Sequence, residues 1–332
     1  MPFNAAKAGP IETLAGVATW SRGCERRQRL DAMVALAESR NELIVRADDL
    51  DTDPMLFNCA NGTLDLRTGE IRDPAPDDLI TKIARVRYDP AAKCPKFESF
   101  LLQVLAGNCD LIAFVQRFLG MSLTGDVREQ VFVMFNGEGG NGKSVLVDLI
   151  LWMMGEYASM APASLVVETG RSEHPTEIAD LMGRRLVIAS ESNKDVNLRE
   201  DQVKRLTGDR RLKGRLMRGD FFEFDRTHKL VSLVNRLPRV RENSHAMWRR
   251  IFVVPFSVVI AEDKKDTGLL DSLRHEGAGI LNWLIAGCLA WQKGGLAPPE
   301  AVQVATRGYR QREDSFGHFL SDRCELEPIE PG

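Results

Sequence analysis

The sequence has no long uninterrupted apolar run, and this absence limits where the protein can work. Its longest apolar stretches, residues 146–154 and 280–289, carry polar breaks and fall short of the roughly 20 residues that a membrane-spanning helix needs. The amino-terminal residues also contain no apolar core of a secretory signal peptide. We therefore expect a cytoplasmic protein that has no membrane partner.

Cysteine and histidine are scarce, and neither is spaced as a set of metal ligands. The six cysteines include no Cys-x-x-Cys pair, and the closest two, Cys94 and Cys109, are fifteen residues apart. The five histidines show no zinc-ligand spacing either. Reduced thiols that fill gaps in a core are the simpler interpretation of these cysteines. The sequence therefore predicts no zinc centre.

A strong overall charge is missing as well. The 332 residues carry a formal net charge of −3 at pH 7, so the whole molecule is not a polycation. The charge is unevenly distributed, however. Residues 199–250 contain 15 Lys and Arg against 7 Asp and Glu, a local charge of +8 that leaves −11 for the remainder. A basic block inside an acidic chain indicates a confined path for an anion.

The most informative stretch that is present is a glycine-rich loop between an apolar run and an amphipathic run. It matches the phosphate-loop pattern Gly-x-x-x-x-Gly-Lys-Ser, in the strand–loop–helix context that the pattern requires. Glycines let backbone N–H groups approach an anion, and the following helix points its positive dipole end at the same place. We therefore predict nucleoside triphosphate binding by Gly137, Gly139, Gly140, Asn141, Gly142, Lys143 and Ser144.

Within this loop, the two last residues have separate predicted tasks. The Lys143 ammonium can reach the outer phosphates, and the Ser144 hydroxyl can ligate Mg²⁺. A glycine-rich surface loop without a ligand is the alternative interpretation, and the strand and helix signals on either side disfavour it. ATP and Mg²⁺ are the expected cofactors.

Helix and strand signals divide the chain into three parts. Residues 1–124 are predicted as a smaller N-terminal domain, helical at first, with a β-rich insert near 55–90 and a helix pair over 96–124. Residues 125–260 contain the phosphate loop and form the predicted core. Residues 261–332 are predicted as a C-terminal helical segment.

The predicted core is an α/β fold with a parallel sheet. Apolar runs at 186–190, 230–234 and 251–254 alternate with helical segments after the phosphate loop. Such alternation predicts parallel strands with the ligand at their carboxyl ends. Residues 213–225 alternate differently and predict a β-hairpin whose turn lies near Arg218.

Other polar residues stand where a triphosphate hydrolase needs them. Glu191 follows a predicted strand and could polarise the attacking water, although a plain surface glutamate is the alternative. Asn235 also follows a predicted strand and could contact the γ-phosphate, although Asn-Arg-Leu-Pro is a turn sequence too. Arg249 and Arg250 could supply a cation to the γ-phosphate of a neighbouring subunit. One of the two could instead pair with an acid at the subunit surface.

Five segments in order resemble one family, the superfamily 3 helicases. They are the phosphate loop, residues 185–191 (Arg-Leu-Val-Ile-Ala-Ser-Glu), 203–209 (Val-Lys-Arg-Leu-Thr-Gly-Asp), 235–238 (Asn-Arg-Leu-Pro) and 248–256 (Trp-Arg-Arg-Ile-Phe-Val-Val-Pro-Phe). The subtype that they resemble is the phage- and plasmid-encoded primase-helicase, related to the poxvirus enzyme. The stretch from Phe57 to Pro90 is similar to the domain that precedes the motor in that family.

The resemblance implies an AAA+ ATPase core that forms a ring, usually a hexamer, and moves along single-stranded DNA with 3′ to 5′ polarity. It implies ATP bound between subunits, with cis roles for Lys143, Ser144, Glu191 and Asn235. It implies that Arg250 acts in trans as the arginine finger. Because Ser190 stands where the family often has a second acid, Mg²⁺ would rest on Ser144, Glu191 and water.

The resemblance also gives the predicted hairpin a role. In the family, a hairpin between the acidic strand and the polar sensor enters the central pore. Here that hairpin would place Arg218 at its tip, with Lys213 and Arg215 as supporting DNA contacts. Phosphate contacts of this kind give salt-dependent binding that is largely blind to sequence.

Relatives in the family usually carry an upstream primase module and a downstream winged-helix domain. Neither fits within this chain, whose last segment would lead toward the latter, so we expect no priming by this chain itself. We expect an ATP-dependent DNA helicase motor of phage or plasmid replication in a bacterial cytoplasm, with a primase module or another replication protein as partner. Two alternatives stay open: a DNA-stimulated ATPase ring for loading or packaging, and a monomeric P-loop phosphotransferase.

Overall fold

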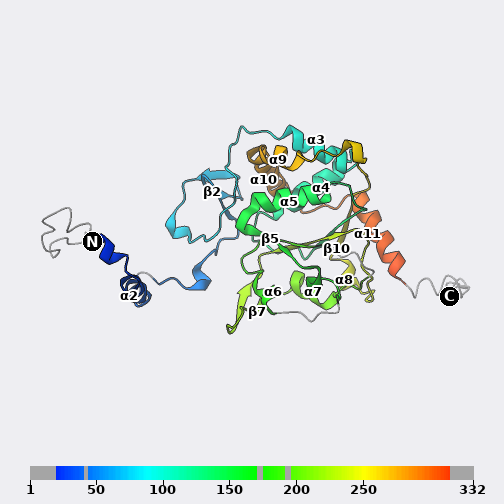
Figure 1. The fold of residues 1–332 in the computed structure, drawn as a ribbon. Coiled ribbons are helices and arrows are strands. Elements are labelled where there is room, and N and C mark those ends of the chain that lie inside the picture. Colours follow the sequence, from blue (N-terminus) through cyan, green and yellow to red (C-terminus); the bar gives the residue numbers. More distant parts are fainter. Residues whose placement is uncertain (1–19, 41–43, 170–174, 191–195, 315–332) are drawn as a thin grey trace, which may run out of the picture. The chain divides into compact units, whose positions relative to one another are not determined.

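The computed structural model describes residues 20–40, 44–169, 175–190 and 196–314 (Figure 1). The contacts divide the chain into two compact units, residues 1–50 and 51–332. In the first unit, helix α2 (Arg27–Glu38) confirms the predicted helical character, and a short 3-10 turn, η1 (Ala47–Asp49), follows. No side chain of α2 is buried, and its apolar residues Leu30, Met33 and Val34 are all exposed.

The second unit begins with the predicted β-rich insert. It is an antiparallel meander of β1 (Leu56–Cys59), β2 (Gly62–Asp65) and β3 (Glu70–Arg72). A 3-10 turn, η2 (Pro76–Asp78), follows, and the predicted helix pair is present as α3 (Pro95–Val104) and α4 (Cys109–Met121). The start of α4 is fixed by the Asn108 side chain, which accepts a hydrogen bond from the backbone N–H of Leu111.

The core is a five-stranded parallel sheet in the order β10-β4-β9-β6-β5. Its strands are β4 (Phe132–Asn136), β5 (Ala158–Ala161), β6 (Leu186–Ala189), β9 (Lys229–Val234) and β10 (Ile251–Pro255). The register pairs Asn136 with Val234 on one side and with Pro255 on the other. The phosphate loop therefore leaves the sheet between the carboxyl ends of β9 and β10. This confirms the predicted α/β class with a parallel sheet, preceded by a smaller α+β part.

Helices cover both faces of this sheet (Figure 1). One face carries α3 and α4 together with α5 (Lys143–Met154), α9 (Leu269–Arg274) and α10 (Gly277–Gly294). The other carries α6 (Pro175–Ala179), α7 (Glu200–Gly208) and α8 (His245–Trp248), while α11 (Glu300–Glu313) packs along β10. Helices α4 and α10 approach very closely, because a Cβ atom at Gly120 would lie 2.3 Å from the backbone nitrogen of Cys288. Short 3-10 turns also lie between these elements, namely η3 (Gly155–Tyr157), η4 (Ala163–Leu165) and η5 (Glu262–Lys264).

The predicted hairpin is a separate two-stranded antiparallel sheet of β7 (Arg211–Arg215) and β8 (Phe221–Asp225). Its connecting loop covers residues 216–220, and Arg218 at the centre adopts a left-handed backbone with φ of 61°. The hairpin stands on α6, since a Cβ atom at Gly214 of β7 would lie only 2.8 Å from the Cα of Ala179.

Two buried cations tie the meander and the end of α4 to the amino ends of the core strands. The Arg185 guanidinium donates to the carbonyls of Leu56 (2.7 Å) and Leu123 (2.6 Å), and the Lys229 ammonium donates to the carbonyl of Thr124. Burial lowers the pKa of both side chains below their ordinary values. These contacts hold the N-terminal elements of this unit in a fixed place on the sheet.

Among the described residues, no single helix is long and apolar enough to cross a membrane. Only α3 and α4 counted together, with a bend of 118° between them, pass such a test of length and composition. Their apolar side chains lie in the core, where Phe97, Phe114 and Phe118 are completely buried.

Candidate nucleotide site and nucleic-acid hairpin

The phosphate loop is held in shape by its glycines and by Asn141. Gly140 and Gly142 adopt φ values of 78° and 83°, which side chains rarely tolerate. A Cβ atom at Gly142 would also lie 2.5 Å from Val104 of α3. The buried Asn141 side chain donates to the Phe256 carbonyl (3.3 Å) and accepts from the backbone N–H of Lys143 (3.4 Å). The conformation of the loop is therefore fixed by a hydrogen bond within it and by its contacts with Phe256 and Val104.

Two predicted site residues meet at this loop. The Lys143 side chain is only 4% exposed, and its ammonium donates to the Gly137 carbonyl and to Asn235 Oδ1 at 3.4 Å. Asn235 directly follows β9, whose last residue pairs with the last residue of β4. The lysine and the polar residue at the next strand end thus face the same space, which is where a phosphate loop holds the outer phosphates.

Of the two predicted Mg²⁺ ligands, Ser144 lies among the described residues and Glu191 does not. Ser144 is exposed in the first turn of α5, at the end where the helix dipole is positive. Glu191 lies outside the described residues, so its predicted role as water-activating and Mg²⁺-binding carboxylate stays a prediction. The predicted strand before it is present as β6, and it lies beside β9 with Ala189 in register with Ser232. Mg²⁺ prefers hydroxyl, carboxylate and phosphate oxygens, and the exposed Ser144 fits that preference.

The connection from β10 to α9 closes over the phosphate loop. The backbone N–H of Phe256 donates to Asn136 (2.7 Å), and that of Ile260 donates to the carbonyl of Gly140 (2.9 Å). Lys265 Nζ lies 3.7 Å from the position that a Cβ atom would take at Gly140. Sequence reasoning missed this second cation, although a pair of lysines soon after the last predicted strand was a visible signal.

The two predicted finger arginines lie at the other end of β10. They precede Ile251, which pairs with Phe132 at the amino end of β4. Five residues of strand, about 16 Å, separate them from the phosphate loop of the same subunit. Neither guanidinium can therefore reach a nucleotide bound by the loop of its own chain.

Arg249 and Arg250 differ in exposure. Arg250 is 8% exposed and donates to the Ala246 carbonyl and to Gln130 Oε1 at 3.2 Å. Burial, followed by the neighbouring Arg249 charge, lowers the pKa of Arg250. Arg249 is exposed and donates to the same Gln130 oxygen at 3.0 Å. Both arginines thus bond to Gln130, and the residue that the sequence favoured as the finger is the buried one of the two.

The outward face of the hairpin is built from three cross-strand pairs. The register sets Arg211 against Asp225, Lys213 against Glu223 and Arg215 against Phe221. Arg211 is neutralised by ion pairs to Glu223 (3.8 Å) and Asp225 (3.5 Å). Within the part of the chain that the structure describes, no ion pair engages Lys213, Arg215 or Arg218, the three residues predicted to contact DNA.

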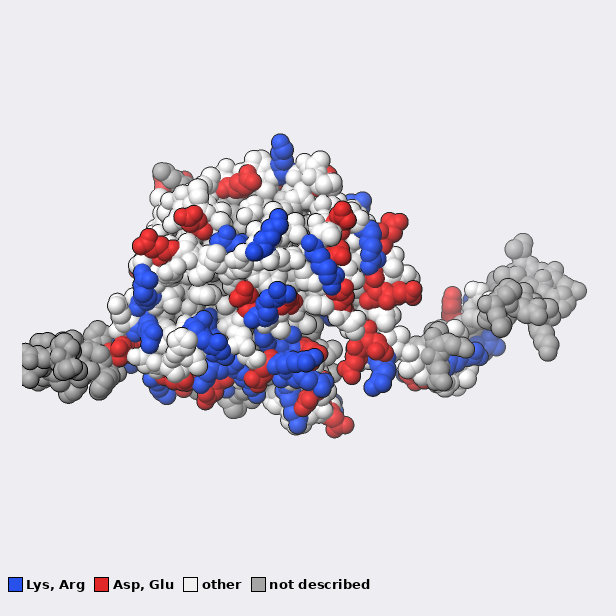
Figure 2. Space-filling view, turned by 180° about the vertical axis from the view of Figure 1, so that it is seen from behind, with Lys and Arg blue, Asp and Glu red and all other residues white. Residues whose placement is uncertain are grey.

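An exposed aromatic ring lies among these cations, and sequence reasoning missed it. Phe221 is 53% exposed, with Lys213 Nζ 5.3 Å and Arg215 Cζ 5.1 Å from its ring centroid. Leu216 and Met217 of the connecting loop are also exposed, by 57% and 77%. Figure 2 shows Lys and Arg side chains gathered among acidic ones along the lower edge of the molecule, where the hairpin projects. Aromatic rings beside cations are typical of surfaces that bind single-stranded nucleic acid.

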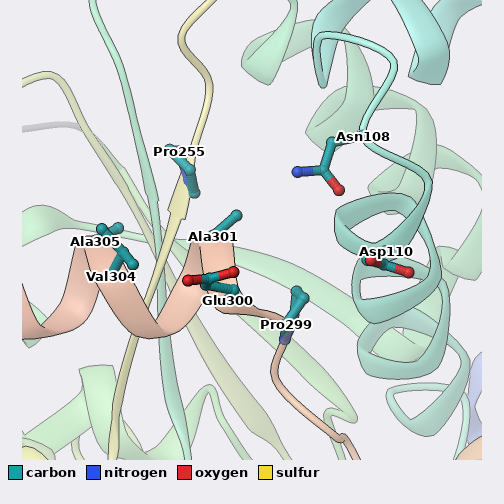
Figure 3. A pocket seen from close by; sticks show the side chains of 8 residues that line it. All are labelled: Asn108, Asp110, Pro255, Pro299, Glu300, Ala301, Val304 and Ala305. Atoms are coloured by element: carbon teal, nitrogen blue, oxygen red, sulfur yellow. The ribbon is translucent and has the colours of Figure 1, made fainter.

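Two of the hollows in the described part of the chain have volumes of several hundred Å³, and a much smaller one of about 10 Å³ lies at the ends of β6 and β9 beside Ser190 and Ser232. One cavity of about 560 Å³ lies between the first turns of α4 and α11 and the end of β10 (Figure 3). Asn108 and Asp110 line it from one side, and Glu300 and Val304 from the other. A second groove of about 410 Å³ lies between α3 and α9 and includes Phe100. None of the predicted site residues lines either hollow.

Two models of protein families match parts of this chain. A family described as "D5 N terminal like" matches residues 11–106, and a family of unknown function, DUF5906, matches residues 135–250. The second match contains the whole phosphate loop, the hairpin and both arginines before β10.

Viral proteins are similar over most of the chain. The candidate helicase L207/L206 of Acanthamoeba polyphaga mimivirus is 26% identical over 296 residues, which is 82% of this chain and 31% of that protein. The candidate helicase 022R of Frog virus 3 (isolate Goorha) is 26% identical over 369 residues, 85% of this chain and 37% of that protein. The chain therefore spans about a third of the length of these relatives.

A solved structure shares the fold. The apo structure of the C-terminal region of NrS-1 aligns with a TM-score of 0.57 at 16% sequence identity. The alignment covers 82% of this chain and 63% of that one. The arrangement of the parallel sheet and its covering helices is thus one already seen in another protein.

Proposed function

Because the chain belongs to the D5-like primase-helicase family, we propose that it is an ATP-dependent DNA helicase motor of phage or plasmid replication. The observation that carries the proposal is the meeting of Lys143 with Asn235 at the phosphate loop. A hydrolase needs a cation and a polar side chain beside the outer phosphates of ATP. The buried Lys143 ammonium and the Asn235 side chain at the end of β9 meet that need, because they face the same space. The division into 1–124, 125–260 and 261–332 remains our proposal for the domains.

In this proposal each subunit binds ATP with its own residues. The loop N–H groups and the Lys143 ammonium hold the phosphates, and Asn235 orients the attacking water beside the γ-phosphate. Ser144 and Glu191 hold Mg²⁺, which neutralises charge on the phosphates when it is bound. Glu191 accepts the proton of the water. Lys265 also lies beside Gly140, where it is ion-paired with Glu262 of the β10–α9 connection.

Hydrolysis in this proposal requires a ring, most simply a hexamer. Because the arginines before β10 lie too far from their own loop, the cation that completes the site comes from the neighbouring subunit. Arg249 offers an exposed guanidinium for this task, whereas Arg250 supports the turn through Ala246 and Gln130. We therefore revise the sequence-based choice of Arg250 and propose Arg249 as the arginine that acts in trans.

Single-stranded DNA is the proposed track. Lys213, Arg215 and Arg218 contact its phosphates from the hairpin, and the hairpin moves when ATP is hydrolysed at the sheet edge. Translocation runs 3′ to 5′ if the family's polarity holds for this chain. A primase module or another replication protein is the proposed partner.

Strand displacement on a forked DNA substrate tests this function. We expect displacement that needs ATP and Mg²⁺, and turnover that rises with single-stranded DNA. Turnover stimulated by DNA without displacement would favour a loading or packaging ring instead. A monomeric particle whose ATP turnover ignores DNA would favour a small-molecule phosphotransferase.

A further inference from the structure

One stretch of chain connects two residues that the proposed reaction uses at opposite ends of the parallel sheet. Asn235 follows the carboxyl end of β9 and bonds to Lys143, whereas Arg249 precedes the amino end of β10 and is exposed. Residues 238–243, all within the described part of the chain, lie between them outside every helix and strand. The position of this 238–243 segment therefore depends on its contacts with other elements.

One side of the 238–243 segment is held by α7 and by the residues before it. Arg239 donates its backbone N–H to the Val196 carbonyl and accepts from the N–H of Leu198, both at 2.8 Å. The Glu200 carboxylate at the start of α7 accepts from the backbone N–H of Glu242, at 3.0 Å, and from that of the residue before it. These bonds fix the middle and the end of the segment.

The other side of the 238–243 segment is held by α11. The Tyr309 hydroxyl donates to the Pro238 carbonyl, where the segment begins. The Glu313 carboxylate accepts from the backbone N–H of Val240 at 2.9 Å. Tyr309 is completely buried, and its ring packs edge-on against Trp248 of α8, with the ring centroids 5.1 Å apart. One helix thus contacts both the segment and the short helix that follows it.

Tyr309 is linked in this way to both ends of the connection. Its hydroxyl holds the carbonyl three residues after Asn235, and its ring packs on the residue directly before Arg249. Helix α11 also packs along the edge strand β10, where the Thr306 hydroxyl accepts from the backbone N–H of Val253 at 3.0 Å. The strand that follows the arginine and the segment that follows Asn235 therefore share one support.

The hydroxyl of Tyr309 matters because its partner is buried. A buried carbonyl that loses its donor is destabilising, so the segment should shift until the Pro238 oxygen finds another partner. Misplacement of an orienting group by about 1 Å can cost on the order of 10² in rate. Because Tyr309 is completely buried, no nucleotide can touch it, and it can act only through its neighbours.

We propose that Tyr309 of α11 is a positioning residue for ATP hydrolysis, which fixes the 238–243 segment and through it Asn235 and Arg249. The proposal rests on the proposed function, and it adds to the reaction a residue that lies outside the phosphate loop and the core sheet. Loss of the hydroxyl should lower the rate of hydrolysis. It should leave nucleotide affinity unchanged, because the phosphate loop keeps its own contacts.

The pair of variants Tyr309→Phe and Tyr157→Phe tests the proposal. Each removes one buried hydroxyl that donates to a backbone carbonyl, that of Pro238 in the first case and of Lys82 in the second. The Tyr157 hydroxyl also accepts from Asn58, so the control loses at least as many hydrogen bonds. At saturating ATP and single-stranded DNA, we expect Tyr309→Phe to lower turnover at least fivefold and Tyr157→Phe to change it less than twofold. Calorimetry should show ADP affinity within twofold of wild type in both.

A second pair of variants tests the same support if Tyr309→Phe fails to fold. Glu313→Leu removes the acceptor of the Val240 N–H, whereas Glu313→Gln keeps a side-chain oxygen in its place. We expect turnover to fall at least fivefold in the first and less than twofold in the second, because the conservative variant restores the contact.

The outcomes separate this proposal from the one on which it rests. A fall of less than fivefold in Tyr309→Phe, or an equal fall in Tyr157→Phe, would overturn the positioning role and leave the proposed hydrolysis intact. Loss of ADP affinity in Tyr309→Phe would also overturn it, because the variant would then disturb the nucleotide site as a whole. If wild-type protein has no turnover, or if Lys143→Ala leaves turnover unchanged, the proposed function itself fails.

Discussion

Two side chains of the phosphate loop, Asn141 and Lys143, are buried within their own subunit, whereas the end of the β7–β8 hairpin is exposed to solvent. At the loop, Asn141 and Lys143 are nearly buried, and their polar atoms bond to Phe256, Gly137 and Asn235. At the hairpin, Met217 and Phe221 are more than half exposed, and no described carboxylate pairs with Arg218. The buried polar groups of the first region thus already have partners within one subunit. The exposed side chains at the end of the hairpin gain binding partners only when another molecule contacts them.

In the proposed reaction, one subunit is enough for some steps, and the other steps need an assembly of subunits. Nucleotide binding needs groups that one folded chain already holds together. Hydrolysis and DNA movement need groups that face outward, namely Arg249 and the cations of the hairpin. Substitutions in the two regions should therefore differ in their effects on nucleotide affinity, ATP turnover and DNA affinity.

The largest effect should come from Lys143→Ala at the phosphate loop. Its ammonium is bonded to Gly137 and Asn235 and faces the outer phosphates, so its loss removes charge stabilisation that no neighbour replaces. We expect ATP turnover to fall at least ~100-fold and ADP binding to weaken strongly. Steady-state turnover and calorimetry measure the two effects. Lys293→Ala, an exposed lysine of α10, is the control, and equal effects of both variants would contradict the assignment.

Arg249→Ala should nearly abolish hydrolysis while leaving nucleotide binding unchanged. An arginine that stabilises transition-state charge from a neighbour contributes on the order of 10³ in turnover. Arg250→Ala should instead lower the unfolding temperature, because Gln130 and Ala246 lose a buried partner. Mixing Arg249→Ala with Lys143→Ala subunits should restore part of the turnover. The reverse pattern, with normal turnover in Arg249→Ala and a stable but inactive Arg250→Ala, would return the role to Arg250.

Substitutions in the hairpin should change DNA binding and leave basal turnover intact. Removal of Lys213, Arg215 or Arg218 should each reduce the slope of log affinity against log salt by about 0.7, the value for one phosphate contact on a single strand. Arg211→Ala is the matched control, since Glu223 and Asp225 already neutralise that charge. Fluorescence anisotropy at several salt concentrations measures the slopes. An equal loss of slope in Arg211→Ala would show that only the overall charge matters.

The exposed ring of the hairpin should contribute separately from its charges. Phe221→Leu removes the aromatic face between Lys213 and Arg215 but keeps an apolar side chain. If a base stacks there, affinity for single strands should fall by about 1–3 kcal/mol with the salt slope unchanged. The same anisotropy titration reports both quantities. A changed slope with unchanged affinity would argue that the ring only positions the cations.

A last prediction concerns the stability of the fold and His228, in the segment that joins the hairpin to β9. Burial, together with the nearby Arg226 and Lys229 charges, lowers the pKa of His228 from 6.5 to about 3. Between these values the unfolded chain binds a proton that the folded chain does not. The free energy of unfolding should therefore decrease as pH falls from about 6.5 toward 3. Urea unfolding at several pH values should show a weaker decrease in His228→Leu than in His275→Leu, which alters an exposed histidine.

Local patterns predicted much of this fold for a physical reason. The glycine spacing of the phosphate loop, the apolar runs of the core strands and the turn at Arg218 are short-range signals, and each element is present. Positive φ at Gly140 and Gly142 explains why glycine stands at those positions. The fold class follows from the alternation of these elements.

Features that depend on long-range packing escaped the sequence. Arg249 and Arg250 are adjacent and chemically identical, and both bond to Gln130. Only burial and the contact of Arg250 with the Ala246 carbonyl distinguish them. Lys265 reaches Gly140 because the β10–α9 connection folds back over the loop. Phe221 is recognised as a platform only when the strand register sets it against Arg215. Glu191 lies outside the described residues and stays a prediction from its position after β6.

The most direct test of the central claim is ATP turnover per subunit, measured over a range of subunit concentrations with single-stranded DNA present. ADP affinity and particle mass are recorded over the same range. The account predicts that turnover per subunit rises steeply as oligomers form, while ADP affinity stays constant because one subunit holds the nucleotide. Full turnover from particles with the mass of a monomer would contradict it.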